Sequence, residues 1–346
     1  MRKPVRLIIL ALLAALTLGI AACGGDDDSG GGGGGGGSSE KKAIKTGLVT
    51  DIGGLNDRSF NFLANKGLED AKSKLGIQGR VFLSKSNGDY IPNLQTSAQQ
   101  QNDLTISVGF LMGDATATVA KKFPQNNFAI VDFSASALKG KPSNVEGLLF
   151  KEQEAGYLAG YLAGLWAKDN NADTVSTVGG QKIPPVDHYI AGFQKGATDA
   201  NPSIKTLNGY SQDFVDQAKC KEIALNQIAQ GSKVVFQVAG QCGLGALDAA
   251  KEKKVQGIGV DADQSYLGPH ILTSALKKVD VAVFDAIKNA QDGKFKGGSD
   301  VIASVKSGGI GLGKLGPEGE KYADQIKQVQ DKIAAGEITD IPDTVK

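Results

Sequence analysis

Histidine and cysteine are scarce in this chain, and neither sign of charge is in surplus. The 346 residues include only two histidines, His188 and His270, and three cysteines. They form no Cys–His cluster, which argues against a zinc site, and we expect no metal. Lys and Arg number 38 against 37 for Asp and Glu. This balance gives no electrostatic case for binding nucleic acid.

Long apolar runs and common catalytic motifs are also missing from most of the chain. No run of about 18 apolar residues follows the N-terminal segment, so we expect no membrane-spanning helix there. There is no Gly-Lys-Ser/Thr phosphate loop and no Gly-x-Ser-x-Gly elbow heading a plausible triad. Residues 311–316 have the glycine spacing of a dinucleotide site, but Pro317 follows at once and no complete βαβ unit surrounds them. We expect no cofactor.

The N-terminus has the order of a secretory signal. A short basic start, residues 1–6, precedes an apolar run over residues 7–22 that is too short to span a membrane comfortably. We predict a signal peptide over residues 1–22. Cys23 follows small residues as in a bacterial lipobox, so we expect it to be lipidated and to form the mature N-terminus. The alternative is an ordinary secreted protein with an incidental cysteine.

Residues 23–42 have the composition of a tether. They contain eight consecutive glycines, residues 30–37, and three consecutive aspartates. Such a segment has no apolar surface to bury and cannot offset the entropy of ordering. A Gly-rich coil of this length reaches roughly 25 Å. We therefore expect a globular body anchored by lipid to the extracytoplasmic face of the cell membrane.

The body begins near residue 43, and its length suits two domains. Apolar, β-rich runs alternate with amphipathic helical patterns, which predicts an α/β fold with parallel sheets covered on both faces. Strands are expected over residues 44–50, 80–84, 104–110, 128–133, 145–150, 174–179, 204–209, 234–238, 257–260 and 271–276. Helices are expected over residues 61–75, 152–167, 187–200, 216–229, 278–292 and 318–335.

Ten strands are many for one sheet, so we predict two Rossmann-like lobes with a hinge and a central ligand cleft. The chain is expected to cross between lobes near residues 150, 271 and 303. Lobe 1 would then comprise residues 43–150 plus 272–303. Lobe 2 would comprise residues 151–271 plus 304–346. Ligands of open parallel sheets bind at the carboxyl ends of the strands, which here would face the cleft.

Cys220 and Cys242 remain once Cys23 is set aside. An even pair in an exported protein is interpreted first as a disulfide. Cys220 lies early in a predicted helix and Cys242 lies just beyond the next strand. Helix starts and strand ends share one edge of a parallel sheet, so the two could be close. The alternative is a pair of inert thiols.

Several predicted strands end in residues suited to ligand binding. Phe60 and Asn61 follow the first strand, where a ring can stack on a flat ligand and an amide can bind its polar edge. Asp57 or Ser59 can cap the helix that begins there. Phe60 could equally be a core residue of that helix.

Three later strand ends have similar features. Gly240 opens a helix after the strand at residues 234–238, where backbone amides can hold ligand oxygens. Asp261 can accept hydrogen bonds from sugar hydroxyls or lie in a solvated turn. Either Lys277 or its neighbour Lys278 could point into the cleft, although lysines are usually on the surface.

These segments, taken in order, resemble the basic membrane protein (BMP) family. The resemblance is carried by residues 47–61, 90–94, 108–112, 128–132, 150–160, 179–185, 259–264 and 272–274. It implies a type I periplasmic-binding-protein fold and a solute-binding lipoprotein of an ABC transporter. The best-known members resemble purine nucleoside receptors.

The resemblance also implies roles for individual residues. Phe60 and Phe236 would stack on a purine base. Asp51 and Asn61 would bind the edge of the base. Asp261 and Lys277 would hold the ribose hydroxyls, and Asp57 and Gly240 complete the predicted ligand-binding set.

We therefore predict a non-enzymatic receptor, a monomer, that captures a nucleoside and delivers it to an ABC permease. Closure of the lobes would be a hinge motion. One alternative is the same kind of receptor for a sugar or another small polar ligand. Another is a nucleoside hydrolase, which would need a metal-binding aspartate cluster that Asp51 and Asp57 alone do not supply.

Overall fold

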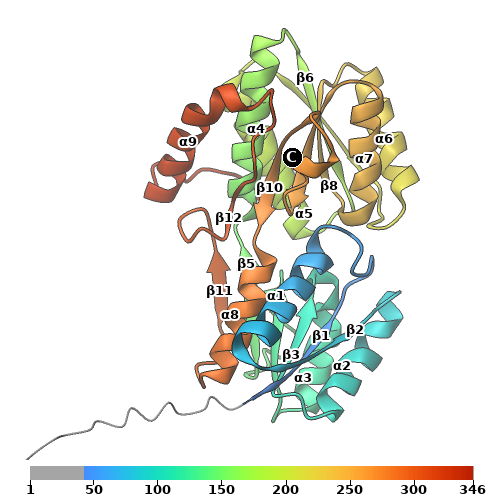
Figure 1. The fold of residues 1–346 in the computed structure, drawn as a ribbon, viewed down its shortest axis with the longest axis vertical. Helices are drawn as coiled ribbons and strands as arrows, with labels where there is room; N and C mark the ends of the chain where they lie inside the picture. Colours follow the sequence, from blue (N-terminus) through green and yellow to red (C-terminus); the bar gives the residue numbers. More distant parts are fainter. Residues whose placement is uncertain (1–42, 346) are drawn as a thin grey trace, which may run out of the picture. The chain divides into compact units, whose positions relative to one another are not determined.

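The structure is a computed structural model that describes residues 43–345. The predicted signal peptide, the lipidated Cys23 and the tether at residues 23–42 lie outside these described residues. Residues 43–345 belong to one compact unit, in which helices and strands alternate around two sheets (Figure 1). Within residues 43–345, no helix has the length and apolar character needed to cross a membrane.

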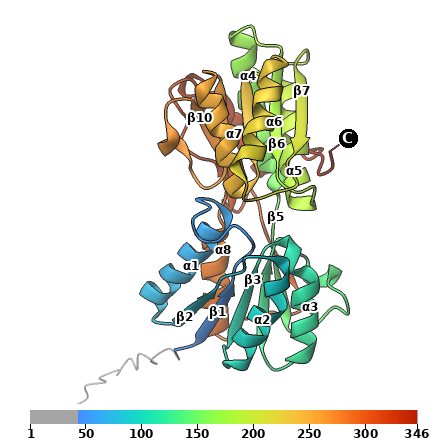
Figure 2. The ribbon, with the colours of Figure 1, turned by 90° about the vertical axis from the view of Figure 1, so that its right-hand side faces the viewer.

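The first sheet has six strands in the order β11-β5-β4-β3-β1-β2, all paired in parallel. Its strands are β1 (Lys45–Val49), β2 (Gln78–Phe82), β3 (Leu104–Val108), β4 (Asn127–Val131), β5 (Val145–Phe150) and β11 (Asp300–Ala303). Its helices are α1 (Phe60–Leu75), α2 (Tyr90–Gln99), α3 (Gly113–Lys122) and α8 (Val279–Gln291). Helices α1 and α8 pack together on one face, and α2 and α3 pack together on the other (Figure 2).

The second sheet also has six strands, in the order β12-β10-β9-β8-β6-β7. Its strands are β6 (Thr174–Gly179), β7 (Lys205–Tyr210), β8 (Val234–Val238), β9 (Gln256–Asp261), β10 (Ile271–Lys277) and β12 (Ile310–Leu312). Its helices are α4 (Glu152–Asp169), α5 (Pro184–Ala200), α6 (Gln217–Ala229) and α7 (Gly240–Glu252), and α9 (Ala323–Ala335) packs against α4. Only β12 runs antiparallel to its neighbour.

Strands buried on both faces explain the continuous apolar runs in the sequence. In β4, Ala129 and Val131 belong to one core cluster, while Phe128 and Ile130 belong to another. The two clusters lie under the two helical layers, so no face of the strand meets water. The prediction of an α/β chain with two parallel sheets is confirmed by the topology.

The chain crosses between the lobes later than the predicted position near residue 271. β10 pairs in parallel with β9, with Ile271 opposite Gly257 and Leu276 opposite Asp261. Residues 272–277 therefore belong to the second sheet, and the chain returns to the first sheet only after Lys277. The prediction that lobe 1 resumes at residue 272 was wrong in this respect, because an apolar strand does not reveal which of two sheets it joins.

Glycines bring α4 and α5 into backbone contact beside the second sheet. A Cβ atom built on Gly156 would lie 2.1 Å from the carbonyl oxygen of Tyr189, and one on Gly160 would lie 2.0 Å from that of Phe193. Gly192 and Gly196 on α5 face the backbone of α4 in the same way. Such a close helix pair has no room for a methyl group.

Replacing Gly160 with alanine is therefore expected to destabilise the fold. The new methyl group would force the two helices apart, and overpacking of this kind costs about 1–3 kcal/mol of unfolding free energy. Chemical denaturation measures the loss. Gly311→Ala is a suitable control because no heavy atom lies within 4 Å of a Cβ built there. Equal denaturation midpoints for the two variants would contradict the expectation.

Candidate functional site

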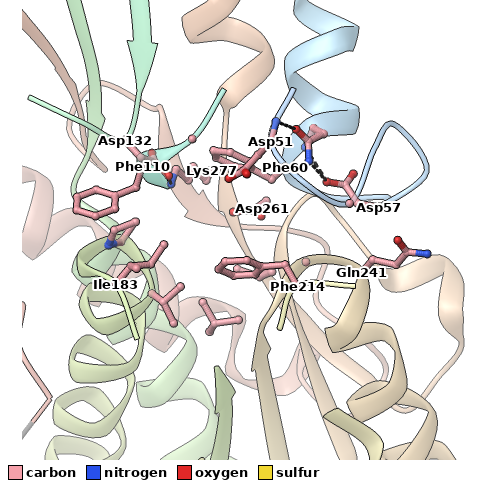
Figure 3. A pocket seen from close by; sticks show the side chains of 18 of the residues that line it. Asp51, Asp57, Phe60, Phe110, Asp132, Ile183, Phe214, Gln241, Asp261 and Lys277 are labelled. Atoms are coloured by element: carbon pink, nitrogen blue, oxygen red, sulfur yellow. Dashed lines mark hydrogen bonds and ion pairs between the residues drawn. The ribbon is translucent and has the colours of Figure 1, made fainter. Parts of the chain in front are cut away.

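A pocket lies where the carboxyl ends of the two sheets meet, with about 640 Å³ of space between its walls, part of it open to solvent (Figure 3). It is lined from both lobes, as expected for two open parallel sheets. The lining residues are Asp51, Ile52, Gly53, Asp57, Phe60, Asn61, Gly109, Phe110, Asp132, Ile183, Pro185, Val186, Tyr189, Phe214, Val238, Gly240, Gln241, Val260, Asp261 and Lys277. Seven of the eight predicted ligand-binding residues are among them.

Asp57 and Asn61 shape the loop between β1 and α1. The Asp57 carboxylate accepts hydrogen bonds from the backbone N–H groups of Asn61 at 2.7 Å, Phe62 at 3.0 Å and Ser59 at 3.1 Å. It thereby caps the start of α1, as a side-chain oxygen at a helix N-terminus does. Asn61 accepts from the backbone N–H of Asp51 at 2.9 Å and donates to Ile52 and Asp57. Asn61 therefore holds the backbone at Asp51, and Asp57 holds Asn61.

Asp51 presents a carboxylate at the end of β1 in a buried setting. It accepts hydrogen bonds from the backbone N–H of Ile52 at 2.7 Å and from the hydroxyl of Tyr90. Burial nevertheless raises the pKa of Asp51 to about 6, because these two bonds only partly replace lost hydration. Its other oxygen packs against the backbone at Gly109, where an added Cβ would lie 2.5 Å away.

Lys277 is the centre of a buried charge cluster in the pocket wall. Its side chain is only 2% exposed and donates to Asp132 Oδ2 at 2.6 Å and to Glu152 Oε1 at 2.9 Å. Glu152 also pairs with His188 Nδ1 at 3.0 Å. The ammonium lies 5.2 Å from the ring centre of Phe60, within cation–π range. Lys278 is exposed, so the structure settles which of the two neighbouring lysines faces inward.

The cluster shifts the pKa values of its members in different directions. Burial raises the pKa of Asp132 to about 7, more than the attraction of Lys277 lowers it. Burial would also raise the pKa of Glu152, but Lys277 and His188 together hold it below its usual range. Burial would lower the pKa of Lys277, yet the surrounding carboxylates raise it above its usual range. Lys277 therefore stays charged, and Asp132 and Glu152 both accept hydrogen bonds from its ammonium group.

Asp261 connects the two lobes at the pocket wall. Its Oδ2 atom accepts a hydrogen bond from Ser59 Oγ at 2.6 Å, and Oδ1 accepts from the Tyr189 hydroxyl at 3.4 Å. Ser59 belongs to the first lobe, while Asp261 and Tyr189 belong to the second. Burial raises the pKa of Asp261. Its φ of 60° is the left-handed conformation that non-glycine residues rarely adopt, which turns the side chain at the end of β9.

Phe236, predicted to stack on the ligand, does not line the pocket. Its side chain is fully buried, with its ring centre 5.2 Å from that of Phe193 and 6.0 Å from that of Tyr189. Side chains of β8 alternate between the two helical layers, and Phe236 falls on the face that meets α5. That prediction was wrong because the ring lies too far from the strand end to reach the cleft.

Two other aromatic rings line the pocket, Phe214 from the second lobe and Phe110 from the first. Phe214 comes from the loop between β7 and α6, and Phe110 follows β3 and stacks on Phe133 at 4.9 Å between ring centres. Sequence reasoning missed both, as well as Asp132, Glu152 and the lobe-bridging role of Ser59. An acidic residue directly after an apolar strand was an available signal for Asp132. Nothing local distinguished Phe214.

Two further sequence predictions concern this part of the molecule. Gly240 lines the pocket with a φ of 56°, a conformation that suits glycine at the start of α7. Cys220 and Cys242 form a disulfide, with their Cα atoms 5.5 Å apart. Within residues 43–345, no group of three or more His, Cys, Asp or Glu residues is placed to hold a metal ion.

Two α/β lobes with a pocket between them are the architecture of the periplasmic-binding-protein fold. A solute-binding protein of an ABC transporter system from Aeropyrum pernix K1 superposes with a TM-score of 0.78 at 28% identity, covering 86% of this chain and 94% of that one. A glucose-galactose binding protein from Geobacillus stearothermophilus has a TM-score of 0.58 at 16% identity and shares the fold alone; the match covers 75% of this chain and 95% of that one.

Residues 44–344 match the family model described as "ABC transporter substrate-binding protein PnrA-like", and the chain belongs to that family. The ABC transporter nucleoside-binding protein BmpA of Lactococcus lactis is 35% identical, covering 86% of this chain and 89% of the relative. Basic membrane protein B of Borreliella burgdorferi is 30% identical, covering 86% and 87%. This protein is thus an ABC transporter substrate-binding protein, with a small ligand and a transporter as its partners.

Proposed function

We propose that this protein captures a purine nucleoside between its lobes and releases it unaltered to an ABC importer. The observation that carries the proposal is the combination of aromatic rings and carboxylates in one pocket, whose lining includes Phe60, Asp51 and Asp132. Similarity to the nucleoside-binding relative supports it. Nothing in the arrangement requires a bond to be broken.

Phe60 and Phe214 give the pocket aromatic faces from opposite lobes (Figure 3). Stacking of a base on an aromatic side chain contributes about 1–3 kcal/mol and tolerates different bases. Closing the lobes would bring both faces onto one ligand, which fits a planar heterocycle better than a sugar. Phe214 thus takes the role that the sequence suggested for Phe236.

Carboxylates give the pocket acceptors for ligand N–H and O–H groups. Asp132 Oδ1 is buried and has no hydrogen-bond partner among the described residues, so a ligand hydroxyl there would satisfy it. Asp261 also lines the pocket and would be a second acceptor for hydroxyls. Asp51 would accept a hydrogen bond from the edge of a base. At Asp132 Oδ1, an analogue that lacks the matching hydroxyl would leave a buried oxygen unpaired and bind much more weakly.

The charge of the pocket favours a neutral ligand. Asp51, Asp57, Asp132 and Asp261 line it, against one lysine that is already paired with carboxylates. A phosphate group would meet net negative potential, and like charges in such a setting cost several kcal/mol. We therefore propose that the ligand is a nucleoside and that nucleotides are rejected.

Anchoring by lipid at Cys23 and an extracytoplasmic position complete the proposal. They rest on the sequence of residues 1–42 and on similarity to relatives described as lipoproteins, such as one from Pyrococcus horikoshii that is 35% identical. A receptor tethered there would meet solutes before they reach the permease. Metabolic labelling with palmitate and its loss in Cys23→Ala tests the anchor.

Calorimetry with a matched ligand panel tests the proposed function. The panel comprises inosine, guanosine, adenosine, uridine, the free purine bases, ribose, glucose and the nucleoside monophosphates. Heat is expected with purine nucleosides, and monophosphates are expected to bind at least about 100-fold more weakly. Binding of ribose or glucose without any response to nucleosides would favour a sugar receptor instead. Release of free base during incubation would point to a hydrolase.

Removing the Phe60 ring is expected to weaken nucleoside binding. Phe60→Ala takes away one stacked face, so the affinity should fall about 5- to 150-fold, as expected for a loss of 1–3 kcal/mol. Phe62→Ala is the matched control, because Phe62 lies two residues further along α1 and is 44% exposed. Titration of both variants with the same nucleoside gives the comparison. Similar affinities would place the ligand elsewhere in the pocket.

A further inference from the structure

Phe214 lies in a loop that needs support from outside its own strand. The loop, residues 211–216, follows β7, which is the edge strand of the second sheet and pairs only with β6 among residues 43–345. To line the pocket, the loop has to reach across the end of β6. There the ring packs on Gly180, where an added Cβ would lie 2.3 Å from it.

Part of that support comes from the loop itself. The backbone N–H of Ser211 donates to the carbonyl oxygen of Gly179 at 2.9 Å, which ties the start of the loop to β6. The Asp213 carboxylate accepts from the backbone N–H of Val215 at 2.8 Å and of Asp216 at 3.1 Å. These bonds set the turn, but none of them fixes the loop relative to α7, which forms the neighbouring pocket wall.

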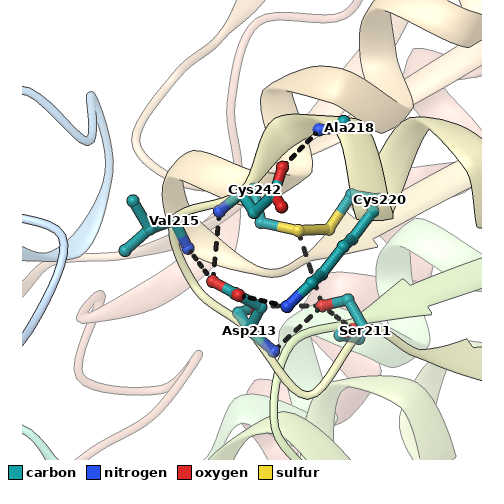
Figure 4. A network of polar contacts seen from close by, with 9 residues as sticks. Ser211, Asp213, Val215, Ala218, Cys220 and Cys242 are labelled. Atoms are coloured by element: carbon teal, nitrogen blue, oxygen red, sulfur yellow. Dashed lines mark hydrogen bonds and ion pairs between the residues drawn. A yellow bond between two sulfur atoms is a disulfide. The ribbon is translucent and has the colours of Figure 1, made fainter.

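Cys242 supplies the link to α7 (Figure 4). Its backbone N–H donates to the carbonyl oxygen of Phe214 at 3.1 Å, and its Sγ atom lies 3.4 Å from Ser211 Oγ. The same residue is joined by the disulfide to Cys220, in the first turns of α6. The disulfide therefore connects both helices that begin beside the loop, at the residue that also bonds Phe214.

Packing between α6 and α7 fixes their spacing at a point away from the disulfide. Gly245 on α7 approaches α6 so closely that an added Cβ would lie 1.9 Å from the carbonyl oxygen of Gln217. That contact sets the distance between the helices about one turn beyond Cys242. The disulfide then fixes the first turn of α7, where helix ends otherwise fray. Both cysteine side chains are fully buried, so the link sits in the protein interior.

We propose that the Cys220–Cys242 disulfide is a positioning element of the binding site, which holds Phe214 against the ligand. Oxidation of the two thiols would thus set the affinity of the receptor and not only its stability. The inference rests on the proposed function, since it assigns Phe214 to ligand binding.

A double-mutant cycle tests the inference. Nucleoside affinity is measured for the wild type, for Cys220→Ala/Cys242→Ala, for Phe214→Ala and for all three substitutions together, well below each melting temperature. If the disulfide acts through Phe214, removing the disulfide should weaken binding about tenfold in the protein that keeps Phe214. In the Phe214→Ala variant, removing the disulfide should weaken binding less than about twofold. Equal losses in both backgrounds, or no loss, would overturn the inference.

A control separates positioning from general destabilisation. Ala249→Gly lies in the same buried cluster on α7 but two turns from Cys242, and should lower stability while leaving affinity within about twofold. Absence of nucleoside binding by the wild type would instead reject the proposed function. In that case hydrogen exchange still tests whether the disulfide holds the loop in place. The backbone amides of residues 211–216 should exchange faster in the variant without the disulfide than in the wild type.

Chemical reduction provides a second route if the cysteine variant does not fold. A phosphine reductant with one water converts the disulfide to two thiols and is itself oxidised to the phosphine oxide. Alkylation and mass measurement give the fraction reduced. Affinity should fall in proportion to that fraction in the wild type and stay unchanged in the Phe214→Ala variant. An affinity independent of the fraction reduced would contradict the proposal.

Discussion

Replacing Lys277 with methionine is expected to lower the free energy of unfolding by about 3–5 kcal/mol, the usual penalty for removing one partner of a buried ion pair. Methionine fills similar space but leaves Asp132 and Glu152 facing each other without the ammonium that both contact. Urea denaturation near pH 7.5 measures the loss. The loss should shrink in acid, because a protonated carboxyl no longer needs the lysine.

Lys278→Met is the matched control for this variant. Lys278 is the next residue in the chain and is exposed, so its replacement should change stability by no more than about 0.5 kcal/mol. The two substitutions are chemically identical and differ only in burial. If both variants unfolded at the same urea concentration, the buried charge cluster would not contribute to stability as described.

Replacing Asp51 with asparagine is expected to raise the free energy of unfolding while weakening ligand binding. The pKa of Asp51 is about 6 in the folded chain against 3.8 ordinarily, so the ionised carboxylate is held there at a cost of about 2–3 kcal/mol at neutral pH. Asparagine removes that cost and keeps an oxygen for Ile52 and Tyr90. Nucleoside affinity should fall about 10- to 100-fold as a charged acceptor is lost.

The pH dependence of this stability gain identifies its cause. Because the folded pKa lies above the unfolded one, the folded chain binds the proton more tightly, and the cost is fully present only above about pH 6. The difference between Asp51→Asn and the wild type should therefore disappear as the pH falls toward 4. Asp340→Asn, at a carboxylate 80% exposed, should show no such trend. A difference that stayed constant with pH would contradict burial as the source.

The sheets of this protein could be predicted because buried parallel strands have an unmistakable composition. Continuous apolar runs such as β3 and β4 need helices on both faces, and their alternation with helical patterns leaves few other folds. The membership of β10 could not be predicted in the same way. Its composition fits either sheet, and only its pairing with β9 decides the matter.

The polar parts of the site were predictable where they follow a strand directly. Asp51 and Asp261 both stand at strand ends, and parallel topology brings such positions together. The aromatic ring that lines the second-lobe wall was not predictable, because no local pattern shows that Phe214, in a loop, reaches the pocket while Phe236, in β8, stays in the core. The partners of Lys277 come from β4 and α4 regions far away in sequence, so no local pattern could identify them.

The hydrogen bond from Ser59 to Asp261 bears on selectivity. A ligand hydroxyl that arrives at this carboxylate would exchange for the serine hydroxyl and would gain only the difference between two similar bonds. Sugar contacts at this oxygen would then add little to the binding constant. Discrimination among ligands would rest on acceptors such as Asp132 Oδ1, where no protein hydroxyl among residues 43–345 competes.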